Sequence, residues 1–288
     1  MTTPPSAPIL VTGAPGNVGT PLVTELRRHG AAVRVGAFDV AAARAAFGED
    51  VEIVPFDVTD PSTYTVFDGI ERLFLLRPPA IVDIKHVIGP ALDNARARGV
   101  RHVVFLSIQG AASNRLVPHH KVEQHLRGSG MAWTFIRAAY FMQNLSTVHA
   151  LDIRARDEIY LPAGRSSRVA HVDARDVAAV AAIALTQPGH EGTALTPTGP
   201  VALTYDECAA VLSDVLGRRI RYTDPTPWHY LRRMRRRGMS LGLILVTLGI
   251  YTAARFGLAA GLTDDVKRIT GRPPIDFETF ARDTNTAW

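Results

Sequence analysis

The chain has 288 residues, of which 47% are hydrophobic and 20% charged, and its formal net charge is +5. This composition is typical of a globular protein and excludes wholesale disorder. The single cysteine, Cys208, excludes an intrachain disulfide, a four-cysteine zinc site and a cysteine redox pair. The first residues have neither a basic start nor an apolar core, so we predict no signal peptide and expect a cytoplasmic protein.

After a Pro-containing lead-in at residues 1–8, strands and helices are predicted to alternate. Apolar residues at helical spacing predict helices between the strands, and Gly30 and Gly99 end two of them. Short apolar runs predict six strands, at residues 9–11, 33–37, 51–54, 73–76, 102–106 and 133–136. Such alternation predicts a Rossmann-type α/β fold, a doubly wound parallel sheet covered by helices on both faces.

The pattern changes after residue 137. A further strand is predicted at 168–172, followed by an alanine-rich helix that Asp173 caps. From about residue 200 the chain reads as irregular and helical, which predicts a smaller cap over the strand ends. We therefore expect a dinucleotide-binding domain at 1–200 and a substrate-binding cap at 201–288, with about 145–167 contributing to the cap.

The strongest motif is Thr12-Gly-Ala-Pro-Gly-Asn-Val-Gly19, which lies between the first strand and the first helix. Its three glycines allow a tight turn, a close approach of the backbone to a pyrophosphate, and packing of the helix on the sheet. Free N–H groups at the start of the helix would then hold the phosphates. The motif predicts dinucleotide binding, against the alternative of an ordinary glycine turn.

The TGAPGNVG loop together with this sheet resembles the extended and atypical short-chain dehydrogenase/reductases. Five further segments narrow the resemblance to the NmrA-like family, on the branch with the type-2 quinone oxidoreductases: 56–60, 105–107, 130–137, 141–144 and 172–178, joined by Gly271-Arg-Pro-Pro274. The resemblance covers essentially the whole chain. It implies a Rossmann fold, a nicotinamide cofactor and reductase activity.

The cofactor is expected to be NADP or NAD. Asp39, 20 residues beyond Gly19, could bond a ribose 2′-hydroxyl and favour NAD, or could be a loop acid or a helix cap. Family members often carry an NADP-binding arginine at the position of Phe38, and Arg34 or Arg44 could replace it here. Family habit therefore gives a slight preference for NADP. The residues expected at the cofactor are Thr12, Gly13, Pro15, Gly16, Asn17, Val18, Gly19, Phe38, Asp39, Asp57, Val58, Leu76, Arg77 and Ser107.

No tyrosine is followed four residues later by a lysine, so the usual Tyr-x-x-x-Lys pair of the superfamily is absent. In its place stands Pro118-His119-His120-Lys121, at the start of a predicted helix. Related reductases carry a lysine or histidine at the position of His119. We predict that His119 polarises the substrate oxygen and relays a proton. His120 is the rival, and Lys121 or Glu123 would orient either one.

Ser107 ends the fifth strand, where superfamily members keep a hydroxyl near the nicotinamide, and it completes the predicted catalytic set with His119 and Lys121. A hydrolase pairing of Ser107 with His119 lacks the G-x-S-x-G elbow. Tyr140 and Asn144 are predicted to contact substrate or nicotinamide. Aromatic residues are candidates for pocket walls or for core packing, namely Tyr140, Phe141, Trp228, Tyr230 and Tyr251. The histidine spacing predicts no metal site.

Arg232, Arg233, Arg235, Arg236 and Arg237 carry the whole positive excess, and a solvated helix face is favoured over an anionic partner. The apolar run from Leu241 to Ala254 is too short for a membrane anchor, which favours a buried cap helix or a subunit contact. We therefore predict no nucleic-acid and no membrane partner, a small apolar or aromatic substrate, and leave a homodimer open.

Two functions remain in view. The first is an NAD(P)H-dependent oxidoreductase that passes hydride to a quinone, enone or ketone, including a tailoring step on a natural product. The second is a non-catalytic NAD(P)-binding redox sensor, with which the missing Tyr-x-x-x-Lys pair is compatible.

Overall fold

The structure, a computed structural model, describes residues 7–288, so most of the predicted lead-in lies outside the described residues. The described chain divides into two compact units. Unit 1 holds the residues up to Ala138 together with Ala174–Pro197 and Arg268–Gly271. Unit 2 holds Ala139–Asp173, Thr198–Lys267 and Arg272–Trp288. The expected boundary at residue 200 lies close to Pro197, where the chain passes from unit 1 to unit 2. Residues 145–167, expected to contribute to the cap, lie within a segment of unit 2.

Unit 1 is built on a seven-stranded parallel sheet with the strand order β10-β6-β5-β4-β1-β2-β3. This confirms the predicted Rossmann-type fold. The first six strands match the predicted ones within two residues at each end, and β10 was not predicted. The strands are β1 (Ile9–Thr12), β2 (Val33–Ala37), β3 (Glu52–Pro55), β4 (Arg72–Leu75), β5 (His102–Ile108), β6 (Ala132–Ala138) and β10 (Thr193–Leu195).

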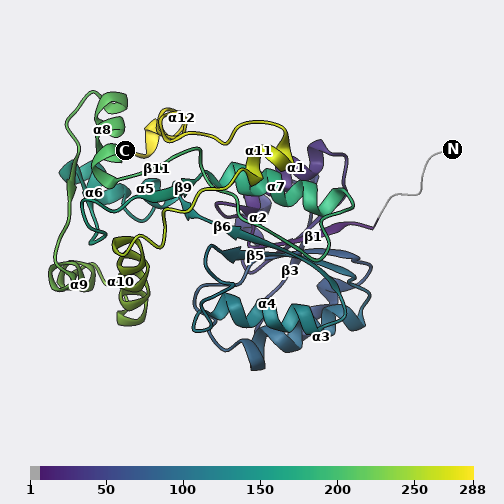
Figure 1. The fold of residues 1–288 in the computed structure, drawn as a ribbon. Helices are drawn as coiled ribbons and strands as arrows, with labels where there is room; N and C mark the ends of the chain where they lie inside the picture. Colours follow the sequence, from purple (N-terminus) through teal and green to yellow (C-terminus); the bar gives the residue numbers. More distant parts are fainter. Residues whose placement is uncertain (1–6) are drawn as a thin grey trace. The chain divides into compact units, whose positions relative to one another are not determined.

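Helices cover both faces of this sheet (Figure 1). One face carries α1 (Gly19–Arg28) beside α7 (Ala174–Thr186), and the other carries α3 (Gly89–Ala97) beside α4 (Pro118–Gly128). Helix α2 (Val40–Phe47) joins β2 to β3, a 3-10 helix spans Pro61–Phe67, and a π-helix at Ile84–Ile88 leads into α3. Strand residues such as Leu73, Val103 and Phe135 share one buried cluster with residues of α3 and α4, so the strands are covered on that face.

Unit 2 has its own core and two small sheets, one in the order β11-β9-β7 and one that pairs β12 with β8. The strand predicted at 168–172 is present, but it lies in the first of these small sheets. The strands are β7 (Tyr140–Phe141), β8 (Glu158–Tyr160), β9 (Val169–Val172), β11 (Ala202–Leu203) and β12 (Arg221–Thr223). The helices are α5 (Gln143–Ser146), α6 (Ala150–Arg156), α8 (Tyr205–Leu216), α9 (Pro227–Arg236), α10 (Leu241–Arg255) and α12 (Phe277–Asp283), with a 3-10 turn at Asn285–Ala287. Helix α11 (Asp265–Thr270) begins in unit 2 and ends in unit 1.

The arginine run is only partly the solvated face that its sequence predicts. Arg237 donates to both carboxylate oxygens of Asp152, at 2.7 and 2.5 Å, and Asp152 is 1% exposed. Arg233 donates to Asp152 at 3.2 Å and to Glu158 at 2.6 Å, and its guanidinium lies over the ring of Tyr160. Two arginines of the run therefore hold the interior of unit 2 together.

Of the two alternatives predicted for the apolar run, the buried cap helix is wrong, and the subunit contact stays a prediction. Of the residues in α10, only Ile244, Tyr251 and Ala254 are buried. Leu245 and Val246 are more than half exposed. Within residues 7–288 no helix is both long enough and apolar enough to span a membrane.

Candidate active site

The glycine loop lies at the point where the strand order of the central sheet reverses. Strand β1 is flanked by β2 on one side and by β4 on the other, and the chain leads away from β1 in both directions. In open α/β sheets the ligand crevice lies outside the carboxyl ends of the strands at this switch point. The four adjacent strands β4, β1, β2 and β3 end just before Leu76, the glycine loop, Phe38 and Asp57. The predicted cofactor residues therefore gather at one edge.

Three glycines are required where the loop turns. Gly13 has a φ of +76°, and a Cβ there would lie 2.8 Å from the side chain of Leu76. A Cβ on Gly16 or on Gly19 would lie 2.6 Å from the carbonyl oxygen of Gly13. Real Cβ atoms do not approach backbone so closely, and a bulkier residue would open the turn. We call this tight turn, which only glycine fits at positions 13, 16 and 19, the glycine cradle.

The amide end of α1 is left without a protein cap. Val18, the residue before the helix, makes no side-chain capping bond, and the first turn holds no acidic residue. The Gly16 amide is used within the loop, donating to the Thr20 hydroxyl at 3.2 Å. Pro15, Gly16 and Asn17 are exposed. An uncapped helix start beside a glycine cradle fits a phosphate group, because the helix dipole and free amides favour negative charge.

Thr12 joins two strands at the switch point. Its hydroxyl donates to the carbonyl of Phe74 at 3.1 Å and accepts from the Leu76 amide at 2.9 Å. The first bond is buried and the second partly buried, and Thr12 is 3% exposed. Thr12 therefore fixes the shape of the loop through its side chain.

The predicted cofactor residues after β2 and β3 lie in turns at the carboxyl edge of the sheet. Asp39 caps α2, accepting from the Ala42 amide at 2.9 Å, so the helix-cap role weighed from the sequence is present. Phe38 is 85% exposed. Asp57 accepts from both the amide and the hydroxyl of Thr59, and Val58 beside it is buried. A cap leaves one carboxylate oxygen of Asp39 available, so both roles are compatible.

The two arginines considered as substitutes for a phosphate-binding arginine are engaged elsewhere. Arg34 pairs with Glu52 at 2.8 Å and donates to the carbonyls of Val66 and Asp68. Arg44 pairs with Glu49 at 2.9 Å. Neither ion pair lies in the glycine loop.

Arg77 is committed to its own loop. One nitrogen of its guanidinium donates to the carbonyls of Pro78, Pro79 and Ile81, at 2.8, 3.2 and 2.6 Å. Burial lowers the pKa of Arg77. The side chain shapes the segment after β4 and brings a positive charge toward His119, whose pKa it helps to depress.

Ser107, Glu123 and Arg137 form a buried cluster that the sequence does not predict as a unit. Ser107 and Arg137 are paired residues of β5 and β6. The Ser107 hydroxyl donates to Glu123 at 2.7 Å, and Arg137 donates to both Glu123 oxygens, at 3.0 and 2.6 Å. Since Ser107 donates its proton to this carboxylate, the hydrolase pairing with His119 is absent. The spacing of Glu123 four residues after His119 is the signal that places both on one face of α4.

His119 lies in the first turn of α4, against Phe105, with ring centroids 6.0 Å apart. Its Nδ1 is buried and has no hydrogen-bond partner in the described chain. Burial, then the charge of Arg77, lowers the pKa of His119 to about 4, although Glu123 acts in the opposite direction. The imidazole is therefore neutral at physiological pH.

The neighbouring residues of the segment point elsewhere. Nδ1 of His120 lies 2.8 Å from the carbonyl of Ala111, which ties it to the preceding loop. Lys121 is exposed, and the acid whose pKa it lowers is Asp83. Glu123 binds Ser107 and Arg137, not a histidine ring. Within this segment, His119 is the residue whose buried ring nitrogen has no partner in the described chain.

Tyr140 and Asn144 belong to unit 2. The Tyr140 hydroxyl lies 3.4 Å from that of Tyr251, which in turn lies 2.8 Å from Nε2 of His149. Burial raises the pKa of Tyr140 to about 12. Of the other aromatic candidates, Tyr230 and Tyr251 are core residues and Trp228 is 67% exposed. Asn144 contributes to the environment of Tyr140, lowering its pKa.

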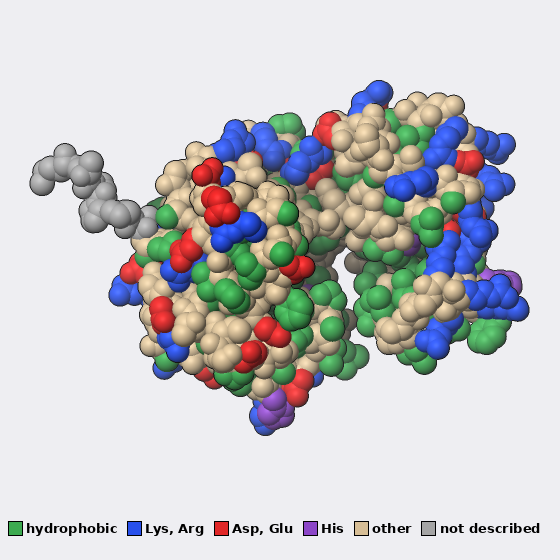
Figure 2. All heavy atoms as spheres, turned by 180° about the vertical axis from the view of Figure 1, so that it is seen from behind, with side chains coloured by type: hydrophobic (Ala, Val, Ile, Leu, Met, Phe, Trp, Pro, Cys, Tyr) green, Lys and Arg blue, Asp and Glu red, His purple; other side chains and the backbone are tan. Residues whose placement is uncertain are grey.

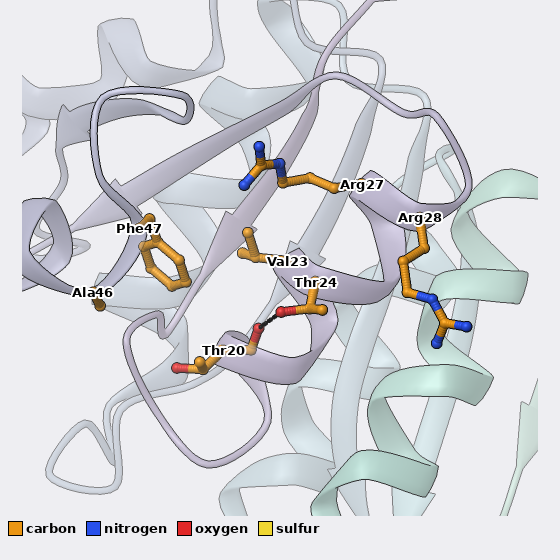
Figure 3. A pocket seen from close by; sticks show the side chains of 7 residues that line it. All are labelled: Thr20, Val23, Thr24, Arg27, Arg28, Ala46 and Phe47. Atoms are coloured by element: carbon orange, nitrogen blue, oxygen red, sulfur yellow. Dashed lines mark hydrogen bonds between the residues drawn. The ribbon is translucent and has the colours of Figure 1, made fainter.

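A surface hollow of about 440 Å³ in unit 1 meets the glycine loop at Thr20, whose hydroxyl accepts from the Gly16 amide (Figure 3). It is lined by Thr20, Val23, Thr24, Arg27, Arg28, Ala46 and Phe47, from α1 and the end of α2. None of the predicted cofactor residues lines it. Among residues 7–288 no cluster of His, Cys, Asp or Glu has the geometry of a metal site.

The sequence and the fold match known proteins over nearly their full length. An NAD(P)H azoreductase from Xenophilus azovorans is 35% identical over 279 residues, 95% of this chain and 96% of the relative. The NADPH-dependent quinone oxidoreductase QOR2 of Escherichia coli, solved with NADPH, superposes with a TM-score of 0.84 at 22% identity, covering 96% of this chain and 99% of that one. The Citrobacter sp. triphenylmethane reductase, solved with NADP(H), gives 0.81 at 24% identity over 98% and 100%.

The model of the NmrA-like family matches residues 5–246. That range includes the glycine loop, the Ser107–Glu123–Arg137 cluster and His119. With the 35% identity to the azoreductase across 95% of the chain, it shows that this protein belongs to the NmrA-like family, as the sequence motifs predict.

Proposed function

We propose that this protein is an NAD(P)H-dependent oxidoreductase that reduces a small apolar or aromatic acceptor, such as a quinone, an enone or a ketone. The observation that carries the proposal is the glycine cradle at the switch point. At Gly13, Gly16 and Gly19 a Cβ would come within 2.8 Å of neighbouring atoms, beside a helix start that no side chain caps. The family relatives support the same class, since one is named an NAD(P)H azoreductase.

The residues of unit 1 divide into binding and positioning roles. The backbone of Gly13 and Asn17 would hold the pyrophosphate, while the Gly16 amide stays bonded to Thr20. Asp39 and Asp57 stand at the edge where the adenosine half belongs. NADP or NAD supplies the hydride when bound. Of the residues expected at the cofactor, Thr12 and Arg77 serve chiefly to shape the two loops around it.

His119 is proposed to act on the acceptor. A neutral imidazole has one N–H donor and one acceptor nitrogen, so it can polarise an acceptor oxygen and pass on a proton without starting as a cation. Glu123 holds α4 against β5 and β6 through Ser107 and Arg137, which fixes where His119 stands. In this scheme Ser107 is a positioning residue, and Lys121 is a solvent-exposed neighbour. Tyr140 and Asn144 remain predicted contacts of the substrate or the nicotinamide.

The test begins with binding. Calorimetric titration of the full chain with NADPH and with NADH establishes whether it binds either nucleotide and which it prefers. Oxidation of the bound dinucleotide is then followed by its absorbance with a panel of quinones, enones, ketones and azo dyes. We expect turnover with at least one class, and a loss of about a hundredfold in kcat/KM for His119→Ala, the usual size of a general acid–base contribution. His29→Ala, an exposed residue at the end of α1, is the matched control.

The alternative of a non-catalytic redox sensor is supported by one feature, the absence of a Tyr-x-x-x-Lys pair. The same experiment separates the two functions. Tight nucleotide binding without oxidation by any acceptor in the panel would favour the sensor. Failure to bind either nucleotide would remove both.

A further inference from the structure

Helix α9 presents two different faces. Tyr230 and Met234 are buried, and Arg233 and Arg237 on the same side bind Asp152 and Glu158. The opposite side carries three arginines, Arg232, Arg235 and Arg236, which are exposed. Because residues three and four apart share a helix face, Trp228 lies on this side with Arg232 and Arg235. Trp228 is 67% exposed.

The next helix adds an exposed apolar surface. Most residues of α10 are not buried in unit 2. Apolar side chains of the turn after α10, such as Phe256 and Leu258, are exposed as well. Across α9, α10 and the turn after α10, six large apolar residues show between 49% and 75% of their surface to solvent: Trp228, Leu241, Leu245, Val246, Phe256 and Leu258. A soluble domain rarely exposes so many large apolar side chains within one short segment unless they contact something.

Charge decides which kind of partner fits. Between Pro225 and Thr263 the sequence contains no aspartate, glutamate or lysine, so its formally charged side chains are all arginines. Figure 2 shows Lys and Arg side chains gathered over the part of unit 2 that carries α9, with hydrophobic side chains beside them. A second copy placed on this surface would bring the same arginines toward one another, at an electrostatic cost. A partner surface that is both anionic and apolar fits the exposed arginines and the exposed apolar side chains together.

We propose that α9, α10 and the turn after α10 form a peripheral docking surface for an anionic phospholipid bilayer. The exposed leucine and valine side chains of α10 enter the boundary between headgroups and acyl chains, and Trp228 lies at the headgroup level. Arg232, Arg235 and Arg236 bind lipid phosphates. The helix lies along the surface and does not span it, in agreement with its length. The proposal does not depend on the reductase function.

Binding of the full-length protein to lipid vesicles tests this surface. Vesicles of phosphatidylcholine alone are compared with vesicles that also contain phosphatidylglycerol, and bound protein is separated by flotation. We expect binding only with phosphatidylglycerol, and weakening by added salt. Because each basic side chain near an anionic surface contributes roughly fivefold, the triple variant Arg232→Gln, Arg235→Gln, Arg236→Gln should bind about a hundredfold more weakly.

The control removes the same charge elsewhere in unit 2. Arg156, Arg219 and Arg221 are exposed, so their triple change to Gln alters the net charge equally. This control should bind like the wild type. A second variant, Leu245→Ser with Val246→Ser, should also lose binding, because it removes exposed apolar surface and leaves the core of α10 intact.

Three results would overturn the proposal. One is absence of binding to phosphatidylglycerol vesicles. Another is equal loss of binding in the two arginine triples, which would mean that only net charge matters. The third is a wild-type dimer, measured by sedimentation equilibrium, that the Leu245→Ser, Val246→Ser variant converts to monomer while the wild type ignores vesicles. That outcome would assign the surface to a second copy of this chain.

Discussion

Arg137 holds both carboxylate oxygens of Glu123, with Nε 3.0 Å from Oε1 and Nη2 2.6 Å from Oε2. Glu123 is 1% exposed, so its charge is balanced almost entirely by this one partner and by the Ser107 hydroxyl. The pair joins α4 to β6, and Ser107 extends it to β5. The start of α4, and with it His119, is therefore fixed by an internal ion pair.

Replacing Glu123 with Ala should lower the free energy of unfolding by about 3–5 kcal/mol, because it leaves the charge of Arg137 without a partner. Urea denaturation measures the change. Gln124→Ala, at the exposed neighbouring position of α4, is the control and should change the value by less than about 0.5 kcal/mol. Equal stability of the two variants would contradict the structural role of the cluster.

Gly13→Ala should abolish binding of NADPH and NADH, since the new Cβ would lie 2.8 Å from Leu76 at a backbone φ of +76°. Calorimetric titration gives the affinity, and circular dichroism checks that the variant folds. Gly128→Ala, where nothing lies within 4 Å of the new Cβ, should bind as the wild type does. Undiminished affinity of the Gly13 variant would show that the cradle is not the nucleotide site.

Neighbouring arginines of one run should differ in their effect on stability. Arg237→Gln breaks two bonds to the buried Asp152 and should cost about 3 kcal/mol or more. Arg236→Gln, at an exposed position, should cost almost nothing. Thermal and urea unfolding of both variants compare them directly. A similar loss for both would mean that the run acts as one charged surface.

Stability should fall as the pH is lowered from about 6.5 toward 4. Burial lowers the pKa of His149 and of His171 to about 4. Between these values and the ordinary one, the unfolded chain binds protons that the folded chain does not, so acid favours unfolding. Each histidine should contribute about 2 kcal/mol of loss between pH 7 and pH 5, measured by urea denaturation at each pH.

The variant His171→Phe tests the assignment of this pH dependence. It replaces a fully buried imidazole with an apolar ring of similar shape, so the slope of stability against pH should become shallower. His29→Phe, an exposed position, should leave the slope unchanged. An unchanged slope in the His171 variant would show that this imidazole is not kept neutral by burial.

The rate of acceptor reduction should show no inflection from His119 near pH 6.5. Its pKa is lowered to about 4, so the neutral form is present throughout the range from pH 5.5 to 8. The profile of kcat/KM against pH checks this. A break near pH 6.5 that disappears in His119→Ala would mean that the imidazole titrates as an ordinary exposed histidine.

The sequence predicts unit 1 well because its strands are buried on both faces. Runs such as Leu73–Leu75 are continuously apolar, and glycines end the elements around them, so type and order follow from composition alone. The strand at 193–195 escapes because it is three residues long and lies far along the chain from its partner β6. The short strands of unit 2, such as β7 and β11, have two residues each and no periodic pattern to detect.

The candidate site follows the same division. The glycine loop is predictable because only glycine fits the local backbone at Gly13. The Ser107–Glu123–Arg137 cluster joins three elements, and no local pattern states that a helix residue will lie over a pair of strand residues. The exposure of α10 could not be predicted for a related reason, since an apolar run does not indicate how much of it the rest of the chain covers.

The two hydrogen bonds of the Thr12 side chain hold the carboxyl ends of β1 and β4 at a set separation before any nucleotide arrives. The crevice is thus preorganised, and little of the binding free energy has to be spent on ordering it. Valine has nearly the same shape as threonine but would leave a carbonyl and an amide unsatisfied. Thr12 therefore maintains the shape of the crevice through its hydroxyl. A serine at this position would keep the two hydrogen bonds, and a valine would lose them.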